Sequence, residues 1–377
     1  MNTHAEVKLK FCTGNQMIAR GAVRAGCRFF AGYPITPASG IYKGMTDLLQ
    51  QRGDVAISAP DEISALAYCV GASMRGFKTM TATSGPGWAL MIETVQYALM
   101  TETPVVIAFV QRLGPSTGGA TQGAQGDILL SEFCTSGGYT IPILCPSTPL
   151  ECYDLTVKAF VWAEMLRTPV VLLSDKEVGM TGECVDFAKL DDTPSFERTM
   201  KPALSSMRMY DFVEQSDVPG FVSIGSEGKV TATGSAHNKS GGLKKNDAET
   251  LEVLHHLEEK IRFRREELAV TTFDGEEGAS TLLISFGITA RTMCEAVRNA
   301  RKGGRKVSSL SIQSLFPVPE LKIKKALHGI SRIVVAEENL SGQYRGVLSS
   351  LMKDKEVVGV NKIGSMISPS EIEAQIV

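Results

Sequence analysis

The amino-acid sequence predicts an α/β fold whose mostly parallel sheet is covered by helices on both faces. Short apolar runs alternate with segments of helical periodicity from about residue 13 to residue 175. One of these runs, residues 105–110 (VVIAFV), has the continuous apolar character of a buried strand. Turns rich in glycine and proline, at residues 32–37 (GYPITP) and 83–87 (TSGPG), follow two of the expected strands. Together these observations predict the α/β fold class.

The N-terminal elements follow one another in regular alternation. Thr13, Gly14 and Asn15 predict the cap of a helix that continues to about Ala25. Strands are expected at 28–31, 55–57, 79–82, 105–110 and 170–173, and further helices at 41–49, 62–76 and 88–100. This rhythm is typical of a parallel sheet with crossover helices.

The pattern breaks between residues 177 and 250, where 220–245 is rich in Gly, Ser, Lys and Asn and has loop composition. A charged helix is expected at 248–268, followed by strands at 281–286, 306–310 and 333–336. We therefore expect a large N-terminal α/β domain (1–205), a connector with the charged helix (206–272) and a smaller C-terminal α/β domain (273–377).

The composition is that of a soluble globular protein with room for about two domains. A net charge of −2 and a pI near 6.3 give no broad basic surface, so nucleic-acid binding is not expected. The basic cluster 262–265 is followed by two glutamates and predicts a solvated helix face. The first residues lack a secretory signal and no run approaches the roughly 20 apolar residues of a membrane span, so a cytoplasmic protein without a membrane partner is expected.

Eight cysteines are scattered along the chain without a Cys-x-x-Cys pair. This argues against a zinc ribbon or a ferredoxin-type cluster in this chain, and we expect no metal ligands here. Most of the cysteines are predicted to be buried, reduced thiols.

Three side chains stand where the carboxyl ends of the parallel strands place a ligand. Pro34 and Pro37 stiffen the loop around Thr36, which suits the grip of a small polar substrate. Glu62 opens a helix, where a carboxylate can serve chemistry or merely complement the helix dipole. Arg112 follows the most apolar strand, and its guanidinium suits bidentate pairing with a carboxylate, or else a surface salt bridge.

Eight segments carry a more specific signal. They are residues 32–37 (GYPITP), 61–65 (DEISA), 81–87 (TATSGPG), 111–118 (QRLGPSTG), 125–127 (QGD), 285–289 (SFGIT), 315–320 (LFPVPE) and 337–343 (EENLSGQ). Together, and in this order, they closely resemble the α subunit of the 2-oxoacid:ferredoxin oxidoreductases, especially the branch that includes the 2-oxoglutarate enzymes. One departure is residues 233–238 (TGSAHN), where many relatives carry a Glu-His-Asp-like stretch, so a role for that stretch is not carried over.

The resemblance implies the pyrimidine-binding domain of a thiamine diphosphate enzyme for 1–205 and a transketolase C-terminal-like domain for 273–377. It makes Glu62 the carboxylate that binds N1′ of the aminopyrimidine and favours the imino tautomer, which accepts the proton of the thiazolium carbon. It places Thr36 and Arg112 where the family holds the carboxylate of the 2-oxoacid. The loop 84–87 resembles the loop near the cofactor, although a purely structural turn is the alternative, and for 116–118 both loop architecture and substrate contact stay open. The implied cofactor contacts are Tyr33, Pro34, Ile35, Glu62, Ser84, Gly85 and Pro86.

Two features of such enzymes are absent from this sequence. Residues 126–128 (GDI) lack the Gly-Asp-Gly stretch with a following Asn that binds Mg²⁺ and the diphosphate, and the cysteines do not form a cluster motif. The resemblance therefore implies a β subunit that carries Mg²⁺ and a [4Fe–4S] cluster, a thiamine diphosphate shared between the subunits, and an (αβ)2 assembly. Some relatives add a γ subunit or γ domain, and this chain is too short to contain all three regions.

The implied reaction is the oxidative decarboxylation of a 2-oxoacid with coenzyme A to an acyl-CoA and CO₂, with reduction of ferredoxin, in either direction. 2-Oxoglutarate, which would give succinyl-CoA, is the first choice. The alternatives are a pyruvate, branched-chain or aryl 2-oxoacid enzyme of the same family, a non-oxidative thiamine diphosphate decarboxylase subunit, and a non-catalytic assembly subunit with the same fold.

Overall fold

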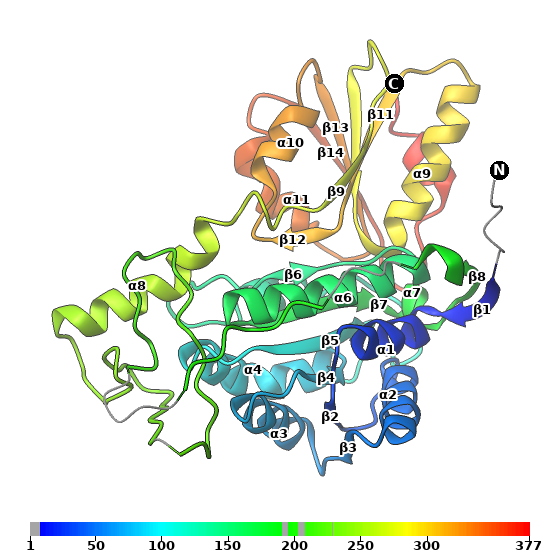
Figure 1. The fold of residues 1–377 in the computed structure, drawn as a ribbon. Coiled ribbons are helices and arrows are strands. Elements are labelled where there is room, and N and C mark those ends of the chain that lie inside the picture. Colours follow the sequence, from blue (N-terminus) through cyan, green and yellow to red (C-terminus); the bar gives the residue numbers. More distant parts are fainter. Residues whose placement is uncertain (1–7, 191–194, 203–207, 228) are drawn as a thin grey trace, which may run out of the picture.

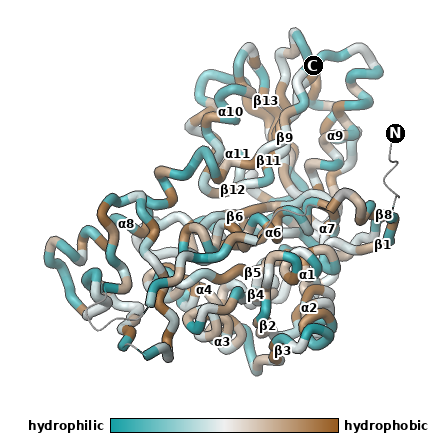
Figure 2. The backbone as a smooth tube through the Cα atoms, viewed as in Figure 1, coloured by the Kyte–Doolittle hydropathy of each residue, from teal (hydrophilic) through white to brown (hydrophobic). Residues whose placement is uncertain are grey.

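The computed structural model describes residues 8–190, 195–202, 208–227 and 229–377. Figure 1 shows two α/β units, with the C-terminal sheet standing above the N-terminal one and helix α8 (Ala248–Arg262) projecting to one side. Figure 2 shows that hydrophobic residues concentrate in the strands of both units. The predicted α/β class is confirmed.

A seven-stranded sheet of order β12-β6-β7-β5-β4-β2-β3 forms the N-terminal unit. All strands run parallel except β12, which pairs antiparallel with β6. The strands are β2 (Phe29–Gly32), β3 (Val55–Ser58), β4 (Thr79–Thr83), β5 (Val105–Gln111), β6 (Ile143–Leu144), β7 (Pro169–Asp175) and β12 (Ser314–Phe316). The helices are α1 (Gly14–Arg24), α2 (Ser39–Arg52), α3 (Glu62–Met74), α4 (Gly85–Met100), α5 (Ile128–Glu132), α6 (Pro149–Leu166) and α7 (Lys176–Met180).

Strand β5 shows how the sheet is buried on both faces. Its residues Val106, Ala108 and Val110 pack in the core formed with α1, α2 and α6. Ile107 and Phe109, which point the other way, pack with α3, α4 and part of the C-terminal unit. Since successive side chains of a strand alternate between faces, a strand covered on both sides is apolar throughout, as the sequence predicts for this run.

The C-terminal unit contains a five-stranded sheet of order β14-β13-β10-β11-β9. Strand β9 (Thr271–Asp274) is antiparallel to its neighbour, whereas β10 (Thr281–Ser285), β11 (Val307–Ile312), β13 (Arg332–Glu337) and β14 (Glu356–Asn361) are parallel. Its helices are α9 (Gly287–Lys302), α10 (Glu320–Ala326), α11 (Gln343–Leu348) and α12 (Pro369–Glu373). A separate two-stranded ribbon joins β1 (Leu9–Thr13) to β8 (Gly182–Asp186).

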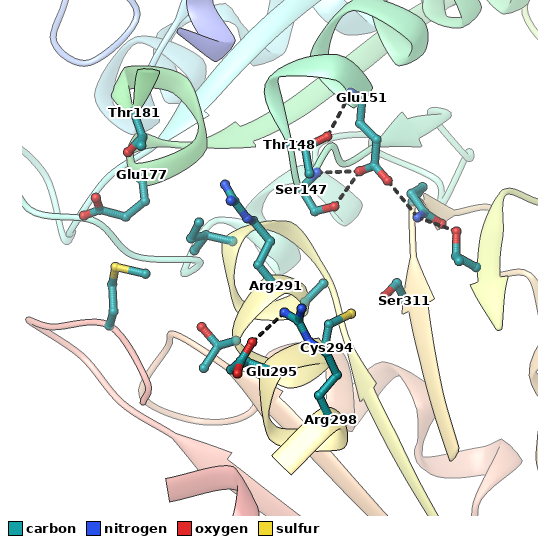
Figure 3. A pocket seen from close by; sticks show the side chains of 16 residues that line it. Ser147, Thr148, Glu151, Glu177, Thr181, Arg291, Cys294, Glu295, Arg298 and Ser311 are labelled. Carbon is teal, nitrogen blue, oxygen red and sulfur yellow. Dashed lines mark hydrogen bonds and ion pairs between the residues drawn. The ribbon is translucent and has the colours of Figure 1, made fainter. Parts of the chain in front are cut away.

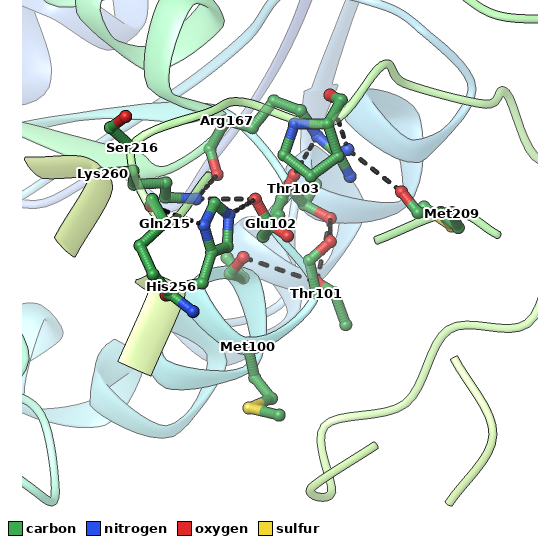
Figure 4. A network of polar contacts seen from close by, with 12 residues as sticks. Met100, Thr101, Glu102, Thr103, Arg167, Met209, Gln215, Ser216, His256 and Lys260 are labelled. Carbon is green, nitrogen blue, oxygen red and sulfur yellow. Dashed lines mark hydrogen bonds and ion pairs between the residues drawn. The ribbon is translucent and has the colours of Figure 1, made fainter. Parts of the chain in front are cut away.

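A buried network of charges anchors α8 to the N-terminal unit (Figure 4). The Oε2 atom of Glu102 accepts hydrogen bonds from Lys260 Nζ at 2.8 Å and from His256 Nε2 at 3.4 Å. Arg167 Nε donates to the backbone carbonyl of Glu102 at 3.2 Å. Burial opposes ionisation of Glu102, but the charges of Lys260 and Arg167 outweigh it and hold the pKa of that carboxyl well below its ordinary value. The connector is therefore attached at the end of the sheet opposite the strand ends where the candidate site lies.

Most expected helices and strands of the alternating segments form within a few residues of the predicted positions. The helix expected at 248–268 ends earlier, at Arg262. The interpretation of residues 262–265 as a solvated helix face is confirmed in part. Arg262 and Phe263 are exposed at the end of the helix, whereas Arg264 and Arg265 are half-buried beyond it, where Arg264 donates to the Ser216 carbonyl at 2.6 Å and Arg265 pairs with Glu320 at 3.0 Å. Six cysteines are buried free thiols, as predicted, while Cys184 and Cys294 are exposed.

Candidate active site

Glu62 is buried at the first turn of α3, beside the carboxyl end of β3. The helix is capped by its neighbour, because the Asp61 carboxylate accepts a hydrogen bond from Ser64 N at 2.7 Å. Glu62 is 7% exposed, and no residue in the described ranges donates a hydrogen bond to its carboxylate. Its carboxylate is therefore free to accept a donor from outside this chain.

A glycine at the start of α4 provides the space that Glu62 occupies. A Cβ atom on Gly87 would lie 2.6 Å from Glu62 Cγ, 2.7 Å from Glu62 Oε1 and 2.2 Å from Thr83 Oγ1. Ser84 is the N-cap residue of α4, yet its side chain makes no capping hydrogen bond, and its buried hydroxyl has no partner among the described residues. These strand ends thus gather a carboxylate and a hydroxyl that the fold itself does not use.

The loop after β2 meets the loop after β5 through Arg112. Arg112 Nη1 donates to the backbone carbonyl of Thr36 at 2.6 Å, and Asn15 Nδ2 holds the same loop by donating to the Pro37 carbonyl at 2.8 Å. Arg112 is 7% exposed, it forms no ion pair with any residue of the described ranges, and its buried Nε has no partner there. A surface salt bridge is therefore not its role. Tyr33 and Pro34 are exposed beside this contact.

Arg112 lines a cavity of about 470 Å³ between the two units. This space is the Arg112 cavity. Much of its wall is apolar, and the polar groups come from both units. The residues that line it are Gly85, Pro86, Ala89, Arg112, Leu113, Gly114, Pro115, Ser116, Ala124, Gly126, Asp127, Leu130, Glu338, Asn339, Leu340, Gln343 and Ile363. Of the predicted site residues, Gly85, Pro86 and Arg112 line the cavity. Thr36 does not line it but accepts the hydrogen bond from Arg112. Glu62 lies behind the first turn of α4, against Gly87.

Two carboxyl groups in this cavity were not predicted as site residues. Burial raises the pKa of Asp127 to about 7, although the charge of Arg112 opposes the shift. Burial also raises the pKa of Glu338 to about 7, opposed by a hydrogen bond from Ile367 N and reinforced by the charges of Asp175 and Glu177. Both groups lie in segments that the resemblance singles out, but their burial depends on contacts between the units.

Gln125 forms the joint that brings the two units together. Its amide nitrogen donates to the Phe286 carbonyl at 3.1 Å, and its amide oxygen accepts from Thr289 Oγ1 at 2.9 Å and from Glu338 N at 3.1 Å. Asp175 completes the joint by accepting from Ile288 N at 2.8 Å. The segments 125–127, 285–289 and 337–343 therefore meet at one point, which fixes the far wall of the Arg112 cavity.

A larger cavity of about 700 Å³ lies elsewhere between the units, against α6, α7 and α9 (Figure 3). None of the predicted site residues lines it. Its two arginines are already paired, Arg291 with Glu183 and Arg298 with Glu295. The smaller cavity is the candidate active site, because Arg112 lines it without an ion pair in the described chain and Glu62 lies near its wall.

The architecture is that of an α/β protein in which, among the described residues, a carboxylate and a hydroxyl without hydrogen-bond partners and an arginine without an ion pair gather at the carboxyl ends of the strands, where such folds bind ligands. Residues 20–252 match the family model described as pyruvate flavodoxin/ferredoxin oxidoreductase, thiamine diphosphate-binding, and residues 279–371 match core domain II of pyruvate:ferredoxin oxidoreductase. The chain belongs to the 2-oxoacid:ferredoxin oxidoreductase family, as an α subunit of the 2-oxoglutarate branch.

The similarity to individual relatives extends over nearly the whole chain. It is 36% identical to the 2-oxoglutarate synthase subunit KorA of Methanocaldococcus jannaschii, over 98% of this chain and 100% of the relative. The subunit of the same name from Methanothermobacter marburgensis is 38% identical, over 96% of each chain.

Solved structures agree with this assignment. A 2-oxoglutarate:ferredoxin oxidoreductase from Magnetococcus marinus, with 2-oxoglutarate, coenzyme A and succinyl-CoA bound, matches 97% of this chain with a TM-score of 0.90 and 28% identity. This chain spans 64% of the length of that chain. A split-gene transketolase matches with a TM-score of 0.57 at 12% identity, which shows the shared fold alone.

Proposed function

We propose that this chain is the α subunit of an enzyme that converts 2-oxoglutarate and coenzyme A to succinyl-CoA and CO₂, with reduction of ferredoxin. The observation that carries the proposal is the full-length similarity to relatives named 2-oxoglutarate synthase subunit KorA, together with the close structural match to an enzyme that holds 2-oxoglutarate, coenzyme A and succinyl-CoA. The retained polar groups at the strand ends support catalysis over the alternative of a non-catalytic assembly subunit.

The residues around Glu62 fit the aminopyrimidine ring of thiamine diphosphate. Glu62 is a buried carboxylate without a hydrogen-bond donor among the described residues, which matches the need for an acceptor at ring N1′. The close approach of Gly87 restricts the positions that this carboxylate can adopt. When bound, thiamine diphosphate supplies the carbon nucleophile and the electron sink that decarboxylation requires. In this proposal Glu62 accepts the hydrogen bond from N1′ and stabilises the proton there.

The other proposed cofactor contacts surround Glu62. The buried hydroxyl of Ser84 has no partner in the described parts of the chain, and Gly85 and Pro86 lie in the first turn of α4 beside it. Tyr33, Pro34 and Ile35 belong to the loop that Arg112 holds through Thr36. These positions favour a cofactor role for loop 84–87 over a purely structural turn.

Thr36 and Arg112 are proposed to bind the carboxylate of the 2-oxoacid. A guanidinium with a free Nε–H presents the fork that a planar carboxylate accepts in a bidentate pair. The contact between Arg112 and the Thr36 carbonyl fixes the direction of that fork. Arg112 would then hold the substrate beside the cofactor while the cavity walls exclude water.

Several partners belong to the proposal. A β subunit would carry Mg²⁺ and a [4Fe–4S] cluster, and it would complete the thiamine diphosphate site in an (αβ)2 assembly with or without a γ subunit. No group of three or more His, Cys, Asp or Glu side chains in the described parts of the chain could hold a metal ion. No helix in those parts is both long and apolar enough to cross a membrane. A cytoplasmic location stays a prediction.

Pyruvate, branched-chain and aryl 2-oxoacids are the rival substrates within the family. A ketoisovalerate oxidoreductase subunit VorB of Methanothermobacter thermautotrophicus is also similar, at 30% identity over 93% of this chain. The complex, co-expressed with its partner subunits and assayed without oxygen, should reduce a viologen dye in a coenzyme A-dependent way, fastest with 2-oxoglutarate. Faster reduction with pyruvate or a branched-chain 2-oxoacid would make that compound the substrate in place of 2-oxoglutarate. A β partner without cluster cysteines would favour the non-oxidative decarboxylase.

A further inference from the structure

The Arg112 cavity contains three charged side chains from three different elements. Arg112 follows β5, Asp127 precedes α5, and Glu338 follows β13 of the C-terminal unit. Among the cavity residues that the structure describes, Arg112 is the sole cation. The cavity therefore presents one permanent positive charge and two groups that can lose a proton.

Arg112 is buried and Asp127 is half-buried with a buried Oδ2 atom, and the two side chains do not neutralise each other. Arg112 Nε and Asp127 Oδ2 each lack a hydrogen-bond partner in the described chain, and no ion pair joins the two residues there. The Asp127 carboxylate lies instead against Gly85, where a Cβ atom would be 3.3 Å from its Oδ1. The space between the guanidinium and this carboxyl group belongs to the cavity and is open to a ligand that carries a negative charge.

We infer that Asp127 and Glu338 set the charge of the Arg112 cavity and thereby make the capture of the 2-oxoacid carboxylate depend on protons. When both carboxyls are neutral, the net charge of the three side chains is +1, which attracts the anionic substrate. When one carboxyl is ionised the net charge is zero, and when both are ionised it is −1, which repels the substrate. The inference rests on the proposed function, because it takes the 2-oxoacid as the ligand of Arg112.

The surroundings of both carboxyls place the loss of their protons near neutral pH. Burial favours the neutral form of Asp127 and raises its pKa to about 7, although the charge of Arg112 favours the ionised form. Glu338 faces Asp175 and Glu177 across the interdomain joint, and their charges add to the effect of burial on its pKa, also about 7. Since a raised carboxyl pKa means that the neutral form persists to higher pH, substrate affinity should be high below about pH 7 and fall above it.

The test measures KM and kcat of the assembled complex for 2-oxoglutarate from about pH 6 to about pH 8.5. In the parent, KM should rise about tenfold for each carboxyl that ionises, with a smaller change in kcat. Asp127→Asn and Glu338→Gln should each remove one of the two tenfold increases of KM with pH, and in the double variant KM should be nearly independent of pH. Glu132→Gln is the matched control, because Glu132 lies on α5 but does not line this cavity. It should keep the parent profile.

A second measurement is independent of turnover. Calorimetric titration of the complex with N-oxalylglycine, an unreactive analogue, in buffers of different ionisation enthalpy should show proton uptake on binding near pH 7, reduced in Asp127→Asn. An unchanged KM profile in the double variant, or binding without proton uptake, would overturn the inference while leaving the proposed function intact. Absence of turnover with every 2-oxoacid would instead contradict the proposed function, and the titration would still report on the cavity.

Discussion

The replacement Gly87→Ala should displace Glu62 without removing its charge. The new Cβ would lie 2.7 Å from Glu62 Oε1 and 2.2 Å from Thr83 Oγ1, and ordinary contact begins near 3.4 Å. The carboxylate must therefore retreat by about 0.7 Å and the threonine hydroxyl by about 1.2 Å. Misplacement of a reacting group by about 1 Å costs about 100-fold in rate, so we expect kcat to fall by about that factor.

The assay is coenzyme A-dependent viologen reduction by the assembled complex under saturating 2-oxoglutarate. Alanine is the better helix former by roughly 0.5–1 kcal/mol, so any loss of stability would come from the contact itself. Gly346→Ala in α11 is the control, since a Cβ there meets no atom within 4 Å, and it should leave kcat unchanged. In a Glu62→Gln background, Gly87→Ala should have little further effect. Parent-like kcat in Gly87→Ala would refute the position assigned to Glu62.

The remaining predictions concern Glu62, Arg112 and the buried network. Glu62→Gln keeps the size of the side chain but removes its charge, so it should lower kcat by about 100-fold or more while subunit assembly, measured by gel filtration, is retained. Arg112→Lys keeps the charge but loses the planar fork, and it should raise KM for the 2-oxoacid about tenfold or more with little change in thiamine diphosphate affinity. If cofactor affinity changed instead, the carboxylate assignment would be wrong. Lys260→Met should destabilise the subunit by about 3 kcal/mol, because it removes the cation that contacts the buried Glu102 carboxylate at 2.8 Å and leaves that charge with the longer contact to His256. The double variant with Glu102→Gln should recover most of that loss in thermal unfolding of the complex, and an equal loss in both variants would contradict the pairing.

The part of the fold that local patterns determine could be predicted from the sequence. Strand β5 is continuously apolar because it is covered on both faces, and α1 begins at Thr13, whose side chain caps it by accepting from Gln16 N. Strand β6 is only two residues long, and β12 pairs with it from the other unit, so neither has a local signal. The antiparallel edge of the seven-stranded sheet was therefore missed.

The candidate site shows the same limit. Glu62, Thr36 and Arg112 could be proposed as site residues because each lies next to a predicted strand within a motif, and their roles stay predictions. The motifs 125–127 and 337–343 were also recognised, but the titration of Asp127 and Glu338 depends on burial at a joint between segments more than 200 residues apart, as the Gln125–Glu338 hydrogen bond shows. One sequence contains no information about such a pairing.

The central claim is that this chain contributes Glu62 and Arg112 to a 2-oxoglutarate-decarboxylating site. The most direct measurement compares the parent complex with Glu62→Gln and Arg112→Lys, loaded with thiamine diphosphate and intact clusters, for coenzyme A-dependent viologen reduction across a panel of 2-oxoacids. We expect the parent to prefer 2-oxoglutarate, Glu62→Gln to lose kcat with every substrate, and Arg112→Lys to lose affinity for the 2-oxoacid. Two results would contradict this assignment: a loaded parent complex for which none of the 2-oxoacids supports dye reduction, or a Glu62→Gln variant with parent-like kcat.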